Sequence, residues 1–406
     1  MLCIRVPNIE GIEMLDKATQ SKASPFDATQ LDRLMDEAGL DVLMATSKHN
    51  VQYLLGGHRS FFFDHMDAIG TDRYLPAFVY PKGAPDKAAY FGHGMETYQT
   101  QIKPLWVPKV NTKSGGSVDV MQKAADYARS LVKKGGRIGV EFAFIPANSE
   151  ATLRKTLPDA EIKDALFVLE RLRVRKTPDE LEKLRLASEL VIDSMLAVIG
   201  SHSAGATKAE LTEALRREET SRGLVFDYCL IAAGSSHNRA PSDQRWEKGE
   251  PLSVDSGGNY HGYIGDLARM GIAGEPDAEL EDLLAEIEAT QQAAFKPIRP
   301  GVNGIEIYAA AEPVLKKSNL HNHYEFLAHG MGLVSHEAPR LTDAGPVPYD
   351  AYDAQRPLEA GMVISVETTL LHPRRGFIKL EDTVAVTPTG HEIYGNRARG
   401  WNRAGV

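Results

Sequence analysis

The spacing of apolar residues predicts alternating helices and strands in the first part of the chain. Segments with apolar residues three and four apart alternate with short apolar runs that are typical of strands. In order, they are 27–39 (helix), 41–45 (strand), 77–80 (strand), 118–134 (helix) and 137–141 (strand). This rhythm predicts a small α/β domain, which we place at residues 1–170.

Longer amphipathic helices are predicted further along the chain. Thr177 suits an N-cap, Pro178 suits the first helical position, and Glu180 completes a capping box. A helix of about 20 residues is expected to start there. A second capping box opens the next helix at Thr207. We place a second domain at residues 171–406.

This second domain is predicted to combine helices with strands. Two more amphipathic helices are expected at 278–294 and near 304–318, with a turn containing Pro and Gly between them. The strand-like segments carry acidic residues among apolar ones, which predicts strands with polar side chains facing inwards. The fold class is therefore α/β (α+β), with a small α/β domain before a larger mixed one.

The composition is that of a globular protein and excludes nucleic acid as an expected partner. A chain of 406 residues with 43% hydrophobic and 25% charged residues is too long for one ordinary core, which favours two domains. The net charge is −9, and no run of Lys and Arg is long enough to follow a phosphate backbone.

The chain shows no signal for a membrane or for export. It has no stretch of about 18 uninterrupted apolar residues, and its first residues do not join a basic region to a long apolar one. Cys3 and Cys229 form no CxxC pair and no disulfide framework. We therefore expect a cytoplasmic protein with no membrane partner.

Asp255 and Asp266 are the first candidate functional residues. They stand eleven residues apart, next to glycine residues in strand-like segments. This spacing fits a hairpin that turns both carboxylates toward one point. Aspartate beside glycine is more often a turn former, so the pair alone does not establish a site.

Three residues nearer the C-terminus strengthen the case for a metal site. His329 lies among glycines that allow close approach to an ion or substrate, although a lone histidine is as often a satisfied polar residue. Glu367 and Glu381 each follow an apolar, strand-like run, where a carboxylate is costly unless a cation or hydrogen bonds compensate it. A ligand set dominated by oxygen indicates hard divalent cations.

The order Asp, Asp, His, Glu, Glu resembles the dinuclear metal set of the pita-bread metallopeptidases. That family includes Xaa-Pro aminopeptidases, prolidases, methionine aminopeptidases and creatinase. The segment from His329 to Arg340 is similar to the prolidase and aminopeptidase P signature, and the segment after Arg175 is similar to the family's entry from its N-terminal domain. The resemblance implies a pita-bread catalytic domain preceded by a smaller creatinase-type α/β domain.

The resemblance also implies a cofactor and a reaction. Two divalent ions, of manganese, cobalt, zinc or iron, would be held by Asp255, Asp266, His329, Glu367 and Glu381. Asp266 and Glu381 would bridge the ions, and Glu367 would take a proton from water and pass one to the leaving nitrogen. The leading hypothesis is a dinuclear metal-dependent hydrolase that cleaves before proline, of aminopeptidase P or prolidase type.

Substrate contacts are implied for three further residues. By resemblance, His336 and His237 would hydrogen-bond the scissile carbonyl or the oxyanion, and Arg340 would pair with a substrate carboxylate. The substrate would be a peptide or another small molecule.

The chain departs from the family pattern close to these residues. Thr368 and Thr369 follow Glu367, where Xaa-Pro enzymes of the family usually have Pro-Gly, and His237 is followed by asparagine, as in creatinase. Ala268 stands where the family often has threonine. The alternative hypothesis is an enzyme for a small zwitterion, either a creatinase-like C–N hydrolase or a dimethylsulfoniopropionate-type lyase. A non-catalytic binding module is disfavoured because all five ligands are present.

The segment after Gly56 mixes aromatic, histidine and acidic residues. It fits either a loop that packs between domains or a contact with a second subunit. In creatinase and many Xaa-Pro relatives the N-terminal domain reaches the active site of the partner subunit. By this resemblance His58, Arg59, Phe62 or His65 would shape the partner's pocket, so a homodimer is expected.

Overall fold

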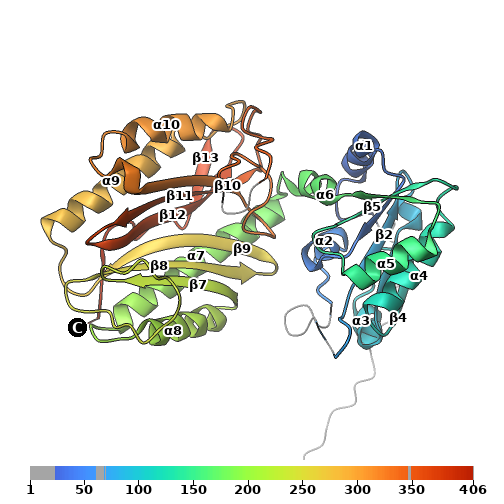
Figure 1. The fold of residues 1–406 in the computed structure, drawn as a ribbon, viewed down its shortest axis with the longest axis horizontal. Coiled ribbons are helices and arrows are strands. Elements are labelled where there is room, and N and C mark those ends of the chain that lie inside the picture. Colours follow the sequence, from blue (N-terminus) through green and yellow to red (C-terminus); the bar gives the residue numbers. More distant parts are fainter. Residues whose placement is uncertain (1–22, 61–67, 69, 346–348, 406) are drawn as a thin grey trace, which may run out of the picture.

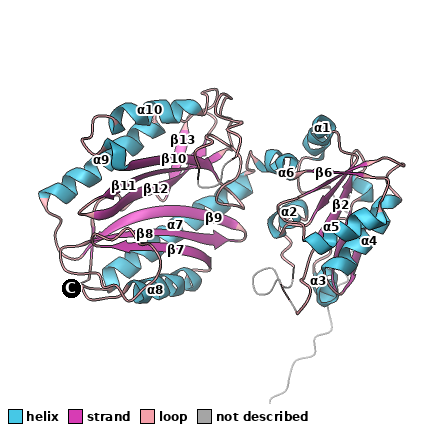
Figure 2. Cartoon of the chain, in the orientation of Figure 1, coloured by secondary structure: helices cyan, strands magenta, loops and turns pink. Residues whose placement is uncertain are grey.

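The protein is divided into two domains, each built on one β-sheet (Figure 1). A computed structural model describes residues 23–60, 68, 70–345 and 349–405. Helices lie against both sheets, and irregular segments connect the elements (Figure 2). The mixed α/β class predicted from the sequence is confirmed.

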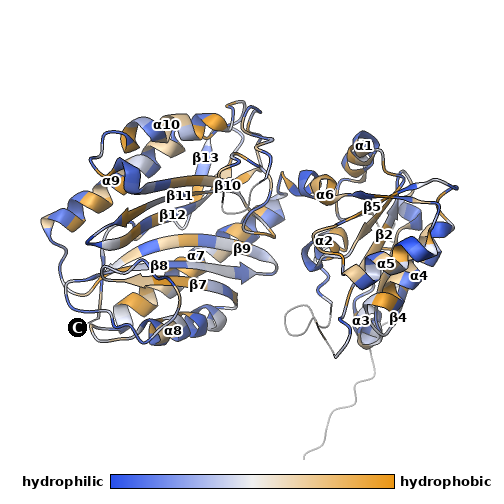
Figure 3. Ribbon diagram, in the orientation of Figure 1, coloured by the Kyte–Doolittle hydropathy of each residue, from blue (hydrophilic) through white to orange (hydrophobic). Residues whose placement is uncertain are grey.

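The N-terminal sheet is mixed and is covered by helices on both faces. Within the described residues its strand order is β4 (Lys109–Ser114), β3 (Ala89–His93), β2 (Ala77–Pro81), β1 (Val42–Ala45), β5 (Arg137–Val140) and β6 (Glu161–Asp164). One face packs against α1 (Ala28–Ala38), α2 (Lys48–Leu54) and α6 (Leu166–Arg173). The other packs against α4 (Ser117–Arg129) and α5 (Ala147–Thr156). In Figure 3, α4 and α5 carry both apolar and polar residues, as expected of helices with one face on a sheet.

Most elements predicted for the N-terminal domain begin and end close to their observed bounds. Asp27 caps α1 by accepting a hydrogen bond from the Gln30 N–H, and Gly39 ends the helix at φ +63°. The helix predicted at 118–134 ends earlier, at Arg129. Leu131 and Val132 lie in a turn after the helix and pack against the core. Their apolar spacing is therefore the same as in a longer helix, which explains why the predicted helix was too long.

The C-terminal sheet carries the predicted site. Among the described residues its main strand order is β10 (Tyr324–Gly330), β11 (Val363–His372), β12 (Gly376–Val386), β9 (Tyr263–Ile272), β8 (Pro251–Tyr260) and β7 (Val225–Ala233). Two short strands flank it, β13 (His391–Tyr394) on β12 and β14 (Asn402–Arg403) on β9. The helices are α7 (Pro178–Ser201), α8 (Lys208–Ser221), α9 (Ala278–Phe295) and α10 (Ile305–Leu315). All four predicted helices are therefore confirmed.

The helices of this domain pack against one face of the sheet, and the predicted ligands lie on the opposite face. Val254 on β8 packs with residues of α7, and Val366 on β11 packs with residues of α9 and α10. Successive side chains of a strand point to opposite faces. Asp255 and Glu367, the next residues along each strand, therefore point away from these helices.

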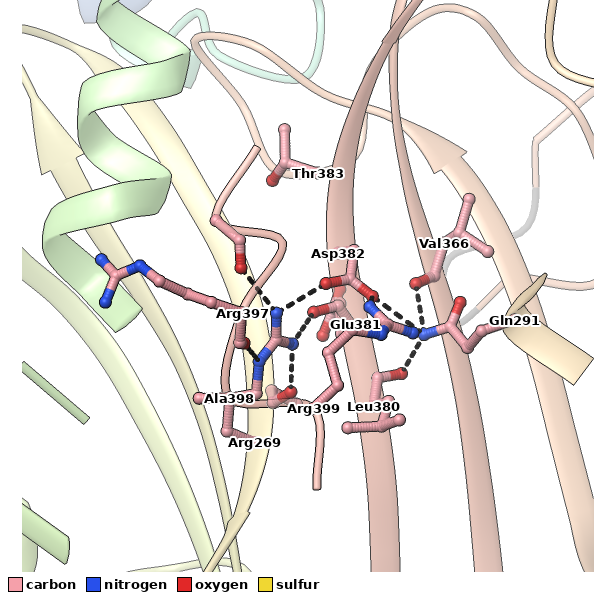
Figure 4. Close-up of polar contacts among 12 residues, drawn as sticks. Arg269, Gln291, Val366, Leu380, Glu381, Asp382, Thr383, Arg397, Ala398 and Arg399 are labelled. Atoms are coloured by element: carbon pink, nitrogen blue, oxygen red, sulfur yellow. Dashed lines mark hydrogen bonds and ion pairs between the residues drawn. The ribbon is translucent and has the colours of Figure 1, made fainter. Parts of the chain in front are cut away.

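A buried arginine joins the two halves of this sheet (Figure 4). Between β9 and β12 the register contains the single pair Ala268–Glu381. Arg269, fully buried, donates to Asp382 at 2.7 Å and to the backbone carbonyl of Glu381 at 2.9 Å. A charged donor bound to several acceptors fixes two strands more firmly than one register pair. Arg269 thus holds Asp266, on β9, beside Glu381.

The two domains meet at α6 and at the turn of the β8–β9 hairpin. The side chain of Gln52 on α2 donates to the carbonyl of His261 at 2.8 Å. The domain boundary predicted between residues 170 and 171 lies within α6 and stays a prediction. No described helix is both long and apolar enough to cross a bilayer.

Glu219 on α8 provides a prediction about pH and stability. It is fully buried, accepts a hydrogen bond from the Ser256 hydroxyl at 2.7 Å, and burial raises its pKa to about 7. Because this pKa is higher in the folded than in the unfolded chain, stability falls as pH rises from about 4.5 to 7. The Glu219→Gln variant has no carboxyl group to ionise at this position and therefore lacks this pH-dependent loss. The unfolding free energy of the variant minus that of the wild type should therefore increase by about 3 kcal/mol between pH 4.5 and 8.

Urea denaturation at several pH values measures this difference. Glu312→Gln, which alters an exposed carboxylate on α10, is the control and should show no such trend. An advantage of Glu219→Gln that is independent of pH would contradict the prediction.

Candidate metal centre

The five predicted ligands lie on five strands of the C-terminal sheet: Asp255 on β8, Asp266 on β9, His329 on β10, Glu367 on β11 and Glu381 on β12. Glu367 and Glu381 are direct register partners. Asp266 lies opposite Gly257, so Asp255 and Asp266 are diagonal neighbours on one face of the predicted hairpin. The fold brings together residues that are separated by up to 126 positions in the sequence.

Asp266, His329 and Glu381 form a group that suits a divalent cation. One ligand atom of each lies within 4.8 Å of the other two, and all three residues are buried. His329 Nε2 has no hydrogen-bond partner among the described residues and lies 3.7 Å from Glu381 Oε1. A buried imidazole nitrogen that makes no hydrogen bond is costly, even with carboxylates at ion-pair distance. A metal ion would satisfy it, so the donor set fits the cofactor implied by the resemblance.

Lys379 lies within the same cluster and was missed by sequence reasoning. Its Nζ is 2.7 Å from Asp255 Oδ2, 2.5 Å from Glu367 Oε2 and 2.8 Å from Glu381 Oε2. The available signal was its position two residues before Glu381 in a strand-like run, which puts both side chains on one face. The ammonium supplies positive charge on one side of the cluster.

The electrostatics of the cluster favour a bound cation. Burial raises the pKa of Asp255 to about 6, against the opposing effect of Lys379, and raises the pKa of Asp266 well above its usual value. Burial lowers the pKa of His329, but neighbouring carboxylates, Glu381 first, raise it to about 9. Despite burial, the pKa of Glu381 is lowered, mainly by Lys379. Negative charge is thus crowded in a site with little water to screen it.

Hydroxyl groups orient two of the carboxylates. Tyr228 donates from its hydroxyl to Asp266, and Ser365 donates to Glu381 Oε1 at 2.8 Å. Gly257 leaves room for this arrangement, because a Cβ there would lie 2.2 Å from the Tyr228 ring. Such outer contacts fix the direction of metal ligands. The Gly-Gly pair after Asp255 was the sequence signal for this close approach.

His336 lies beside the cluster. Its ring stacks on that of His329, with centroids 3.9 Å apart and an interplanar angle of 15°. Its Nδ1 is buried without a hydrogen-bond partner among the described residues. Burial first, and then His329, lowers its pKa to about 4, so the ring is neutral at pH 7. A neutral ring next to the ligands is available to a substrate as donor or acceptor.

The contacts of His237 and Arg340 are with residues other than the five predicted ligands. His237 Nε2 lies 3.2 Å from the carbonyl oxygen of His372, at the end of β11. Arg340 donates from Nε to Glu170 at 2.8 Å, and its guanidinium lies over the Tyr349 ring. Their substrate contacts stay predictions.

A cleft of about 490 Å³ opens onto the cluster. Glu367, Lys379, Thr369 and Phe377 line it, together with Arg239. The Arg239 guanidinium lies over Phe377, 4.9 Å from the ring centroid, and its Nη1 is 3.3 Å from Asp255 Oδ2. A larger cleft of about 790 Å³ lies near α1, but none of the five predicted ligands lines it. Of these two clefts, the smaller is the one lined by a predicted ligand, Glu367.

The segment predicted to reach a second subunit is described in part. His58 is buried in its own domain, 3.3 Å from Glu96 and edge-on to Tyr90. Phe62 and His65 lie outside the described residues, and the backbone carbonyl of Arg59 accepts a hydrogen bond from the Gln99 side chain at 2.7 Å. The homodimer stays a prediction.

Comparisons with known protein families agree with this architecture. The model of "Metallopeptidase family M24" matches residues 182–388, just over half of the chain. The model of "Creatinase/Prolidase N-terminal domain" matches residues 28–175. The two matches correspond to the two sheets, which confirms the creatinase-type domain followed by the pita-bread domain.

Similar proteins support the same assignment. The chain is 24% identical over 368 residues to the uncharacterized peptidase YqhT of Bacillus subtilis, covering 89% of this chain and 95% of that protein. It is 29% identical to an Xaa-Pro dipeptidase of Pyrococcus furiosus, covering 70% and 82%. The solved prolidase from Pyrococcus horikoshii has a TM-score of 0.75 at 20% identity over 91% of this chain and 97% of that one, which shows the shared fold. The protein therefore belongs to metallopeptidase family M24 and is a hydrolase of the peptidase type.

Proposed function

We propose that the protein is a dinuclear metal-dependent Xaa-Pro peptidase, of prolidase or aminopeptidase P type. The observation that carries this proposal is the presence of five ligand-type side chains on five adjacent strands of one sheet, with Glu367 among them lining a cleft. The similarity to the Xaa-Pro dipeptidase of Pyrococcus furiosus supports the choice of substrate class.

Two divalent ions would be held by Asp255, Asp266, His329, Glu367 and Glu381. When bound, such ions lower the pKa of water and polarise the scissile carbonyl. Manganese, cobalt, zinc and iron are all compatible with this mixture of carboxylates and one imidazole. We favour manganese, because oxygen ligands predominate.

The chain's own residues would handle the proton and the substrate. Glu367 lines the cleft and would take a proton from the attacking water and pass it to the proline nitrogen. Neutral His336 would donate a hydrogen bond to the scissile carbonyl oxygen, with His237 as a second candidate. Arg239 lines the cleft and would bind the C-terminal carboxylate of a dipeptide, and Arg340 stays the candidate that the resemblance implies for pairing with a substrate carboxylate.

A panel of substrates tests this proposal. Protein loaded with Mn²⁺ should hydrolyse Xaa-Pro dipeptides faster than matched Xaa-Ala dipeptides, with amino acid release measured by chromatography. Longer Xaa-Pro peptides separate prolidase from aminopeptidase P activity. Failure to cleave any Xaa-Pro substrate with Mn²⁺, Co²⁺, Zn²⁺ or Fe²⁺ would refute the proposal.

A small zwitterion is the second candidate substrate. Arg239 and Glu325 place opposite charges on the lining of one small cleft, and Thr369 stands there too. A creatinase-like C–N hydrolase or a dimethylsulfoniopropionate-type lyase would use such a lining. Creatine and dimethylsulfoniopropionate therefore belong in the same panel, and turnover of either in place of dipeptides would favour this function.

We also propose that the protein acts as a homodimer in the cytoplasm. Cys229, the free cysteine within the described residues, is buried, which is compatible with a reducing compartment. The expected partner contact comes from the segment around Arg59. Light scattering of the purified chain measures the mass, and a monomer at working concentration would contradict the dimer.

A further inference from the structure

Lys208, the first residue of α8, is a buried lysine outside the metal centre. Its side chain is fully buried, and its ammonium donates a hydrogen bond to the backbone carbonyl of Asn238 at 2.5 Å. An ammonium group carries three donors, and burial of a charged group is unfavourable unless its partners compensate for the lost water. A lysine is therefore an unfavourable residue for a position that only needs to fill space.

The start of α8 binds the segment 234–246, which connects β7 to β8. The backbone N–H of Lys208 donates to the carbonyl of Gln244 at 2.9 Å, and that of Ala209 donates to Ser242 at 3.0 Å. The first N–H groups of a helix have no acceptors within the helix, so they are free to bind another segment. The Lys208 side chain adds a third donor, which reaches Asn238. The helix start thus binds this segment at three points.

Asn238 precedes Arg239, which lines the cleft beside Glu367. The backbone of Arg239 is held on both sides. On one side Lys208 binds the carbonyl of Asn238, and on the other the carbonyl of Arg239 accepts a hydrogen bond from the N–H of Ile231 on β7 at 3.0 Å. Of these two hydrogen bonds, the one from Lys208 depends on a side chain and can be removed by substitution.

The Arg239 side chain depends on this backbone for its direction. It is 36% exposed, and its guanidinium lies over the Phe377 ring, 4.9 Å from the centroid. A long, exposed side chain loses rotamer freedom when it binds a ligand, and a side chain already held in place loses less. An aromatic ring stabilises a cation above its face. A shift of the Arg239 backbone would move the guanidinium away from this ring.

We propose that Lys208 is a positioning residue, which fixes the direction in which the Arg239 guanidinium meets a substrate carboxylate. It does so by holding the peptide group between Asn238 and Arg239. Within the part of the chain that the structure describes, no hydrogen bond joins Lys208 to any of the five predicted ligands. This inference rests on the role of Arg239 in the proposed function. The effect of Lys208 should therefore be confined to substrates with a free carboxylate.

Two substrates that differ in one group test the proposal with the full-length protein loaded with Mn²⁺. Alanyl-proline has a free carboxylate, whereas alanyl-proline amide has none. Lys208→Met keeps the length of the side chain without its charge. It should raise KM for alanyl-proline about tenfold and leave kcat within about twofold. The value of kcat/KM for the amide should also stay within about twofold, whereas general damage to the site would affect both substrates alike.

Two further variants serve as controls. Lys248→Met alters an exposed lysine in the turn that follows the segment, and it should leave both substrates unchanged. Arg239→Gln removes the guanidinium itself. In that background Lys208→Met should not raise KM for alanyl-proline any further, because residues that act through one group are not additive.

Amide hydrogen exchange tests the position of Arg239 without any substrate. In Lys208→Met, residues 231–241 should exchange about tenfold faster than in the wild type, because the hydrogen bond between Ile231 and Arg239 opens more often. Strand β8 should exchange at the wild-type rate. Mass spectrometry of peptic fragments measures both regions.

Unchanged exchange of residues 231–241 would overturn the proposal, as would equal losses for alanyl-proline and its amide. If Lys208→Met does not fold, Lys208→Gln, which is also neutral but shorter, has the same expected results. A wild-type protein that cleaves neither substrate would refute the proposed function, and the exchange measurement would then decide whether Lys208 holds Arg239. The two failures are therefore distinguishable.

Discussion

Replacement of Glu367 by glutamine is expected to reduce kcat for the preferred substrate by about 10²–10⁴-fold. The amide cannot take a proton from water, although it keeps the size of the side chain and one oxygen toward the site. Glu367 lines the cleft and, at 17% side-chain exposure, is the most exposed of the four carboxylates in the cluster. This position suits a group that must meet both water and substrate.

Metal content must accompany the rate measurement, because Glu367 is also a proposed ligand. The fall in kcat should persist at Mn²⁺ concentrations that restore full occupancy, which separates proton transfer from loss of metal. Glu392→Gln, at an exposed position on β13, is the matched control and should keep the wild-type rate. A fully loaded Glu367→Gln protein with a near-normal kcat would show that another group accepts the proton.

Local sequence signals predicted those parts of the fold that depend on neighbouring residues. Both capping boxes, at Thr177 and Thr207, are present with reciprocal hydrogen bonds, because the groups involved are three residues apart. The hairpin of Asp255 and Asp266 likewise depends on one short turn. Such features are decided before the chain makes distant contacts.

Long-range neighbours were the parts that could not be predicted. Tyr228 and Asp266 meet because Gly257 admits an aromatic ring, which requires β7, β8 and β9 to be adjacent. In the sequence, Lys379 is an ordinary lysine in a predicted strand. Its hydrogen bond to Asp255 becomes evident only when the strands of the sheet are arranged in space. The ligand types and their order were visible in the sequence, whereas the charges that balance them were not.

The contacts of Arg340 and His237 could not be predicted from the sequence either. Their roles came from resemblance alone, and their recorded partners in this chain are Glu170 and His372. Glu170 belongs to α6, which lies next to the predicted domain boundary. A residue's partners across a domain interface depend on how the domains pack, which no local pattern specifies.

Replacement of Glu337 by alanine is expected to destabilise the protein by about 3–5 kcal/mol, since it leaves two buried cations without their carboxylate. Glu337 pairs with Arg173 at 2.8 Å and with Lys176 at 3.0 Å, and all three side chains are almost fully buried. Arg173 also donates to Asn50 on α2, so the loss should loosen the contact between the domains.

The matched comparison is Glu359→Ala, which removes an ion pair with Arg175 that is about half exposed and should cost less than about 1 kcal/mol. Urea denaturation of both variants and of the wild type gives the two differences. Glu337 directly follows His336, so Glu337→Ala should also lower activity below the denaturation midpoint, whereas Glu359→Ala should not. Equal stability losses in the two variants would show that the buried network does not hold the domains together. A large loss of activity below the denaturation midpoint in Glu337→Ala, but not in Glu359→Ala, would show that the position of His336 depends on the interface with the N-terminal domain.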